Sequence, residues 1–151
     1  MDDFNREALA IEVDTSLPAE RVIRVLEQVI DWRGKPTRIR VDNGPEFIST
    51  ALGFWCEEND IHLQFIQPGK PTQNAYIERF NGSFRRDVLD AYLFDNLDQI
   101  KTLSEEWMED YNNHRPHDAL NGRSPVDLWK TLEEFPTNPQ NIVMTTENEI
   151  V

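Results

Sequence analysis

Residues 41–47 read Val-Asp-Asn-Gly-Pro-Glu-Phe and directly follow the run Thr-Arg-Ile-Arg at residues 37–40. The run predicts a β-strand over 37–42, and Asn43-Gly44-Pro45 predicts a turn because these residue types favour turn conformations. Asp42 is therefore expected where a strand ends. A second carboxylate, Glu78, lies on a predicted helix, in the segment Lys-Pro-Thr-Gln-Asn-Ala-Tyr-Ile-Glu-Arg-Phe-Asn at residues 70–81.

Together, Asp42 and Glu78 suggest a site for divalent metal. Mg²⁺ prefers oxygen ligands, and two such ions about 4 Å apart can activate an attacking hydroxyl and stabilise a leaving oxygen in phosphodiester chemistry. Spacing alone gives the pair little weight, since the chain has 28 acidic residues. Asp42 could instead cap the turn at Asn43-Gly44, and Glu78 could be an ordinary solvent-facing helix residue.

The rest of the chain alternates between predicted strands and helices, which is typical of an α/β fold. We expect strands at residues 7–13, 37–42 and 61–66. We expect helices from residue 17 to Gly34 with Ser16 as N-cap, at 46–59, from 72 to about 92, at 97–113 and at 124–132. Three strands make a thin sheet for this number of helices.

Apolar residues at helical spacing mark the expected core. In segment 72–92 they are Ile77, Phe80, Phe84, Val88 and Ala91, opposite a polar stripe of Asn74, Glu78, Asn81 and Arg85. In segment 46–59 they are Phe47, Leu52, Phe54 and Trp55. We also expect Trp107 and Tyr111 in the core rather than stacking on bases. Cys56 is the only cysteine, so it forms no internal disulfide, and we expect it to be a buried small residue.

The charge of the chain argues against strong autonomous binding to DNA. The formal net charge is -13, with 14 acidic and 11 basic side chains in residues 1–86 and 14 acidic and 4 basic side chains in residues 87–151. A DNA-binding surface would have to be local, because polyanions bind basic patches. No apolar stretch approaches the ~20 residues of a membrane helix, and the N-terminus lacks a signal-peptide pattern.

Residues 41–47 and 71–81 resemble the integrase catalytic core of insertion-sequence transposases. The resemblance is closest to the insertion sequence 3 family, whose cores are similar to retroviral integrases. Residues 111–120, Tyr-Asn-Asn-His-Arg-Pro-His-Asp-Ala-Leu, and Ser124-Pro125 also resemble the C-terminal stretch of that family. The resemblance covers roughly residues 1–132.

This resemblance implies a ribonuclease-H-like fold with a DDE triad. The second Asp of the triad matches Asp42, the Glu matches Glu78, and a basic residue seven positions after the Glu matches Arg85. In such enzymes the triad binds two Mg²⁺ or Mn²⁺ ions, and water and then a DNA 3′-hydroxyl attack phosphodiester bonds. The residues expected to contact DNA are Lys70, Asn74, Arg79, Arg85 and Arg86.

The chain departs from the family at its first residues. Residues 2–6, Asp-Asp-Phe-Asn-Arg, resemble a later turn rather than the first catalytic strand. We therefore expect the chain to start inside the core, without the first two strands, the first catalytic Asp and the upstream helix-turn-helix region. We expect residues 1–132 to form a partial core with a C-terminal helical extension, and residues 133–151 an acidic flexible tail. Metal binding by the two remaining carboxylates, Asp42 and Glu78, should be weak because two ligands hold Mg²⁺ less firmly than three. Without a metal, their mutual repulsion raises the pKa of one of them.

Several candidate residues also have structural interpretations. Asp2 or Asp3 could replace the missing ligand, but we favour no such role because terminal segments are poorly fixed. Arg85 and Arg86 could contact phosphate or pair with neighbouring acids, namely Asp87, Asp90 or Glu78.

The remaining polar candidates have local alternatives as well. Asn74 could orient substrate or make a helix-start hydrogen bond. For His114 and His117 we favour local hydrogen bonds over metal binding, because a spacing of three residues beside Pro116 is a poor helical pair.

Three functional hypotheses follow from the sequence. The first is the C-terminal part of a transposase that performs metal-dependent DNA cleavage and strand transfer. We expect this part to be inactive as an isolated fragment. We also expect DNA as the partner of the full-length protein, self-association, and a location in the bacterial cytoplasm. The alternative is a non-catalytic remnant that associates with itself or another protein through an exposed sheet edge. The third is a simple nuclease of the same fold.

Overall fold

The computed structural model describes residues 1–67, 69–70, 75–133 and 141–144 of the 151-residue chain, with the backbone alone for 132–133 and 141–144. Its helices are α1 (Ala19–Arg33), α2 (Thr50–Glu58), α3 (Ala75–Phe84), α4 (Leu97–Asn113) and α5 (Pro125–Glu133). Its strands are β1 (Arg38–Val41), β2 (His62–Phe65) and β3 (Asn141–Met144). A π-helical turn, η2 (Arg85–Leu89), continues α3, and a 3-10 turn, η3 (Asp118–Leu120), follows α4.

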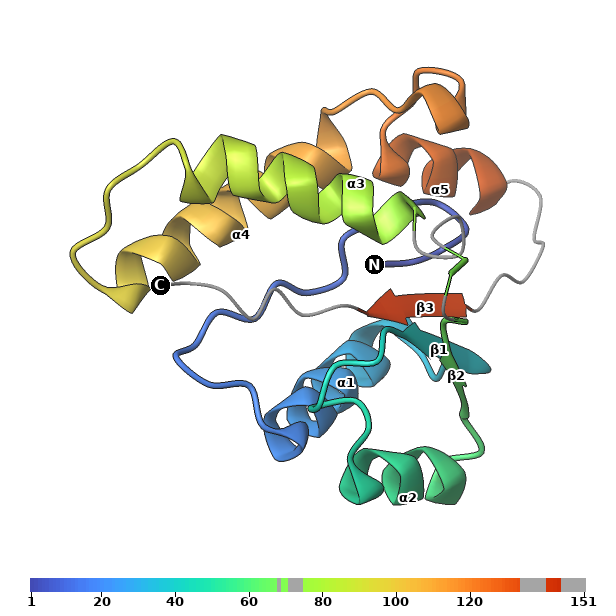
Figure 1. The fold of residues 1–151 in the computed structure, drawn as a ribbon. Coiled ribbons are helices and arrows are strands. Elements are labelled where there is room, and N and C mark those ends of the chain that lie inside the picture. Colours follow the sequence, from blue (N-terminus) through green and yellow to red (C-terminus); the bar gives the residue numbers. More distant parts are fainter. Residues whose placement is uncertain (68, 71–74, 134–140, 145–151) are drawn as a thin grey trace.

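The described strands form one parallel sheet in the order β2-β1-β3. The central strand β1 supplies Ile39 and Val41, both fully buried. Figure 1 shows α1 and α2 on one side of the sheet, with α3, α4 and α5 on the other. Parallel strands covered by helices on both faces are the arrangement expected of an α/β fold, so the predicted fold class agrees with the structure.

Two apolar clusters hold these layers together. The first joins the sheet to α1 and α2 through residues that include Leu26, Ile39, Phe47 and Leu52. The second joins α3 to α4, where the Phe80 ring makes edge contacts with Trp107 at 5.4 Å and Tyr111 at 5.0 Å between ring centroids. The burial of Tyr111 and Cys56 confirms the expectation that both belong to the core.

Residues 1–13 connect the two clusters, and here the prediction of a strand at 7–13 is wrong. The structure gives these residues no strand. Instead the Asn112 side chain on α4 accepts a hydrogen bond from the Ala8 amide at 2.8 Å and donates one to the Ala8 carbonyl at 2.9 Å. The Asn112 side chain therefore gives Ala8 the two backbone hydrogen bonds that a neighbouring strand would give it. The residue pattern of segment 7–13 alone does not reveal this distant partner.

Segment 2–5 is tied to three other elements. Asp2 forms an ion pair with Arg33 of α1 at 2.9 Å, and Asp3 forms one with Arg40 of β1 at 2.6 Å. Asn5 is fully buried, and its side chain donates to the Pro125 carbonyl of α5 at 3.4 Å. The carboxylates of Asp2 and Asp3 are therefore both paired with arginines.

Three other details differ from the sequence predictions. Helix α1 has Pro18, not Ser16, as its N-cap. Helix α2 begins only at Thr50, and its Ser49 cap accepts a hydrogen bond from the Leu52 amide at 3.1 Å. Phe54 is 62% exposed rather than in the core. Residues two positions apart on a helix point in directions about 200° apart, so Phe54 points outward because Leu52 points inward.

The segment at 133–151 contains a strand that the sequence did not predict. β3 pairs with β1 in the register Arg38↔Asn141 to Val41↔Met144. This pairing joins residues far apart in the chain, so no local pattern marks it. Residues 134–140 and 145–151 lie outside the described residues.

The segment predicted as one helix from 72 to about 92 divides at Phe84, where α3 gives way to η2. Ile77, Phe80, Phe84 and Val88 are buried as predicted, but Ala91 is exposed. A π-helical turn adds a residue to the turn and so rotates the following residues away from the earlier face. Helix α4 spans the predicted range of 97–113.

Candidate functional site

Asp42 follows the last residue of β1, at the carboxyl end of the parallel sheet. Its Oδ1 accepts a hydrogen bond from the Gly44 amide at 2.9 Å, so the turn-capping role is real. Burial raises the pKa of the Asp42 carboxyl, the Gly44 hydrogen bond opposes that rise, and the charge of Glu46 adds to it. The carboxylate thus sits in a site that disfavours its charge, as expected of a group that gains from a cation.

Glu46 is a second carboxylate at this turn, and sequence reasoning gave it no role. It is only 7% exposed. A Cβ at Gly44 would lie 2.6 Å from Glu46 Oε1 and 3.0 Å from Asp42 Oδ1. Glycine at this position therefore leaves the space in which the two carboxylates approach each other. Their spacing of four residues around a glycine turn was the signal that could have identified the pair.

Glu78 lies in the first turn of α3 and is exposed. Among the described residues, no group of three or more His, Cys, Asp or Glu side chains is arranged to hold a metal ion. The oxygen ligands of Asp42, Glu46 and Glu78 have the chemistry that Mg²⁺ prefers. Only Asp42 and Glu46 are shown close together, at the Gly44 turn, and the described residues do not gather Glu78 with them into a group of three.

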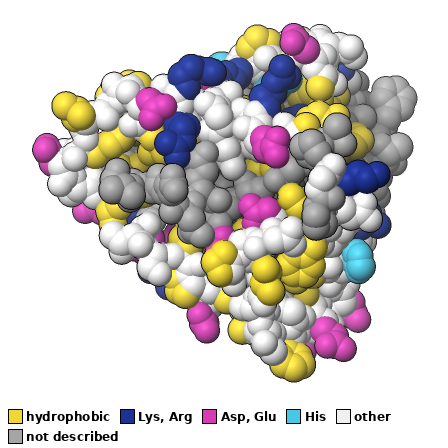
Figure 2. Space-filling view, in the orientation of Figure 1, with side chains coloured by type: hydrophobic (Ala, Val, Ile, Leu, Met, Phe, Trp, Pro, Cys, Tyr) yellow, Lys and Arg dark blue, Asp and Glu magenta, His cyan; other side chains and the backbone are white. Residues whose placement is uncertain are grey.

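Arg85 opens η2, half-buried, seven residues after Glu78. Arg86 is exposed, and its Nε pairs with Asp87 Oδ1 at 3.1 Å, in agreement with the alternative that Arg86 pairs with a neighbouring acid. Lys70 is exposed in the loop after β2, and Asn74 lies outside the described residues. In Figure 2, Lys and Arg side chains gather at the top of the face, above acidic side chains near its centre.

We predicted local hydrogen bonds for the two histidines after α4, and the structure gives them an ion-pair contact and a ring contact. His114 is exposed, and its Nδ1 lies 3.6 Å from Asp110 Oδ1. The His117 ring makes an edge contact with the Tyr111 ring, with centroids 4.8 Å apart. Burial lowers the pKa of His117, and Arg115, Arg6 and Arg79 lower it further.

Two family models, each described as an integrase core domain, match residues 1–71 and residues 59–125. A 31.7 kDa protein of insertion element IS407 from Burkholderia multivorans is 46% identical over 128 residues, covering 85% of this chain and 46% of the relative. A 39.2 kDa protein of IS476 from Xanthomonas euvesicatoria is 44% identical over 125 residues, covering 83% of this chain and 36% of the relative. The chain thus spans less than half the length of these relatives.

Solved structures with a similar fold include catalytic core domains of integrases. The core of HTLV-2 integrase in complex with magnesium is 23% identical, with a TM-score of 0.54 over 74% of this chain and 69% of that chain. The core of BIV integrase is 19% identical, with a TM-score of 0.61 over 87% of this chain and 82% of that chain. At these identities the likeness establishes the fold. Among the described residues no helix is long and apolar enough to cross a membrane.

Proposed function

Because the chain belongs to the integrase core family of insertion-sequence transposases, we propose that it is part of an enzyme that cuts DNA and joins DNA strands during transposition. Its ribonuclease-H-like fold is that of the integrase cores. The observation that supports this proposal most is the position of Asp42. Its carboxyl group lies at the carboxyl end of a parallel sheet, and burial there raises its pKa. Ligands of open α/β sheets bind at this end.

We assign the chemical roles as follows. Asp42 and Glu78 hold Mg²⁺ or Mn²⁺, which supplies an activated water and stabilises a leaving oxygen when bound. Arg85 steers the phosphate, since a guanidinium matches the oxygen geometry of phosphate. Lys70, Asn74, Arg79 and Arg86 contact the DNA backbone. The negative charge of Glu46 raises the pKa of Asp42. A bound cation would therefore relieve more repulsion at Asp42 than it would without Glu46.

This chain alone should bind metal weakly and show no strand transfer. Two carboxylates hold a divalent ion less firmly than three, and the described residues assemble no set of three ligands. This expectation of weak metal binding applies to the present chain and not to the longer relatives, because the chain spans less than half of their length.

Titration with Mn²⁺, followed by electron paramagnetic resonance, tests the metal assignment. Asp42→Asn and Glu78→Gln should each weaken Mn²⁺ binding several-fold. Glu105→Gln is the control, because Glu105 is an exposed carboxylate on α4. Equal binding by all four proteins would refute the roles of Asp42 and Glu78. Strand transfer by the unmodified chain, lost in Glu78→Gln, would refute the proposed inactivity and support the catalytic roles.

A second candidate function is self-association without catalysis. The similar HTLV-2 integrase core has been solved in trimeric and dimeric forms. In this chain Trp32, Ile48 and Phe54 are 57%, 60% and 62% exposed, and exposed large apolar side chains are candidates for contact with a second copy. Light scattering after size-exclusion chromatography tests this role. A monomer at high concentration would argue against it, and the Mn²⁺ titration is independent of that outcome.

A further inference from the structure

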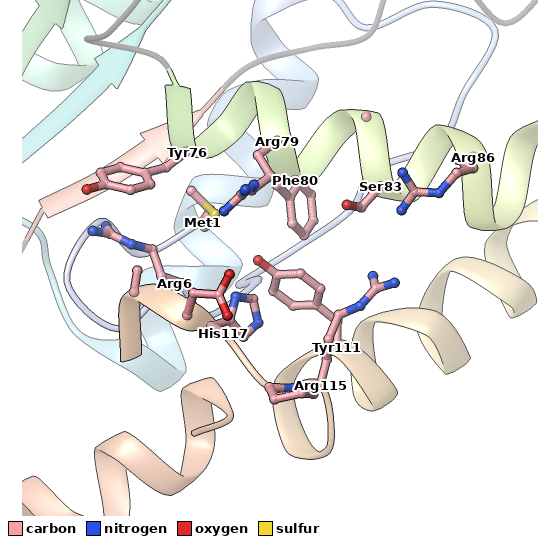
Figure 3. Close-up of a pocket in the computed structure, with 14 residues that line it drawn as sticks. Met1, Arg6, Tyr76, Arg79, Phe80, Ser83, Arg86, Tyr111, Arg115 and His117 are labelled. Atoms are coloured by element: carbon pink, nitrogen blue, oxygen red, sulfur yellow. The ribbon is translucent and has the colours of Figure 1, made fainter. Parts of the chain in front are cut away.

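A basic cavity lies beside α3, and neither Asp42 nor Glu78 is among the residues that line it. Its volume is about 520 Å³, and its walls come from the N-terminal segment, α3 with η2, and residues 111–119. The charged side chains that line it are Arg6, Arg79, Arg86, Arg115 and Asp118. Four arginines face one aspartate in a chain whose net charge is -13. Figure 3 shows Arg79 and Arg86 approaching from α3 and η2, with Arg6, Arg115 and His117 across from them.

The nearby acids do not neutralise these arginines one for one. Asp87 is shared, because its carboxylate lies 2.6 Å from Arg115 and 3.1 Å from Arg86. Asp3 lies 3.4 Å from Arg6 but also pairs with Arg40 at 2.6 Å.

Arg79 is exposed and forms no ion pair with any residue that the structure describes. The cavity therefore keeps an excess of positive charge.

Two buried nitrogen atoms at this cavity have no hydrogen-bond partner within the described part of the chain. They are Nε2 of His117 and Nε of Arg6. A buried polar group without a hydrogen-bond partner destabilises the folded state, so such groups are usually satisfied. Both residues line the cavity, and because the two nitrogen atoms are themselves closed to solvent, a ligand would reach them only after their side chains turn toward it.

We propose that this cavity binds a phosphate group of a DNA strand, at a site distinct from Asp42 and Glu78. This inference rests on the proposed function in DNA transposition. Guanidinium groups form paired hydrogen bonds to phosphate oxygens, which makes arginine clusters selective for them. The volume exceeds that of one phosphate and lies within the range of about 300–1,000 Å³ typical of small-ligand sites, so the attached sugar also fits.

An aromatic side chain at the cavity supports a nucleotide rather than a bare phosphate. Tyr76 lines the cavity and is 46% exposed, with the Arg6 guanidinium 3.4 Å from the centre of its ring. Aromatic and arginine side chains beside a basic groove are the elements that bind single-stranded nucleic acid. Arg79 directly follows Glu78 on α3, and successive helical residues lie about 100° apart. Helix α3 thus presents a carboxylate and a phosphate-binding arginine on different faces.

Fluorescence anisotropy with a labelled, 5′-phosphorylated single-stranded oligonucleotide tests the site. EDTA in the buffer removes metal, so the result does not depend on Asp42 and Glu78. Arg79→Ala should weaken binding about tenfold and reduce the slope of log affinity against log salt by about one. Arg24→Ala, an exposed arginine on α1, is the matched control and should bind within about twofold of the unmodified chain.

Each outcome decides the proposal. Equal affinities of Arg79→Ala and Arg24→Ala, with both variants folded by thermal melting, would overturn it. Binding of inorganic pyrophosphate that depends on Arg79, without binding of the oligonucleotide, would overturn the assignment to DNA. Loss of oligonucleotide binding in Arg79→Ala alongside normal Mn²⁺ binding would support it. The Mn²⁺ titration of Glu78→Gln reports on the metal site of the proposed function separately, so the metal assignment and the cavity assignment can fail independently.

Discussion

Replacing Asn112 with alanine should strongly destabilise the protein, because this one side chain satisfies both backbone groups of Ala8. Its amide accepts from the Ala8 N–H at 2.8 Å and donates to the Ala8 C=O at 2.9 Å. Ala8 is only 2% exposed, so water does not easily replace either bond. In the Asn112→Ala variant both groups lose their partner.

The structure sets the size of this effect. Each buried backbone group left without a partner costs about 1–3 kcal/mol, which gives a total of about 2–6 kcal/mol. Asn112 itself is half-buried, and water entering the vacated space favours the lower part of that range, about 2–3 kcal/mol. Asn112→Asp keeps the acceptor and loses the donor, so it should fall between the unmodified chain and Asn112→Ala.

Urea denaturation followed by circular dichroism measures the free energy of unfolding. Asn113→Ala is the matched control, because Asn113 is exposed and its side chain donates only to the Glu109 carbonyl of its own helix. Its unfolding free energy should change by less than about 0.5 kcal/mol. If Asn112→Ala lost no more stability than Asn113→Ala, the claim that Asn112 anchors the N-terminal segment would be refuted.

Three further predictions concern titratable groups. A carboxyl group whose pKa is raised by folding destabilises the folded state once it ionises, so Asp42→Asn should raise the unfolding free energy in EDTA at pH 7; urea denaturation showing a loss would contradict this. The gain should be below about 1 kcal/mol because Asp42 is partly exposed. Folding lowers the pKa of His117 from its usual 6.5. The unfolded chain therefore binds a proton more readily, and stability should fall as the pH drops through 6.5. His117→Gln should reduce this loss, and an unchanged pH profile would count against it. Burial raises the pKa of Cys56 to about 11, so the native thiol should react with a disulfide reagent far more slowly than in urea; equal rates would be inconsistent with the buried thiol.

The sequence predicted those parts of the fold that depend on local pattern. Helix α4 spans its predicted range, since Asn96 caps its start and accepts a hydrogen bond from the Gln99 amide at 3.1 Å. The predicted strand ending at Asp42 is β1. These elements follow from capping residues, turn residues and periodic burial, all of which are visible in a short stretch of chain.

Features that depend on distant partners were not predictable in the same way. Residues 7–13 have the composition of a strand, yet Ala8 bonds to a side chain 104 positions away. β3 pairs across a similar distance. The approach of Glu46 to Asp42 depends on the conformation of the Gly44 turn. At the site, the position of Asp42 was predicted, whereas the cavity lined by Arg79 and Arg115 required the tertiary structure.

The late position of β3 in the chain has a consequence for the timing of synthesis. β1 ends at Val41 and its partner strand ends at Met144, so the ribosome must add about 100 residues between them, which takes about 5–20 s at typical rates. Of the strands that the structure describes, β2 can pair with one edge of β1 during that interval, whereas β3 reaches the other edge only later. An open strand edge is a site of pairing between chains. Newly made copies on neighbouring ribosomes are therefore expected to meet most readily in this interval, before β3 has emerged.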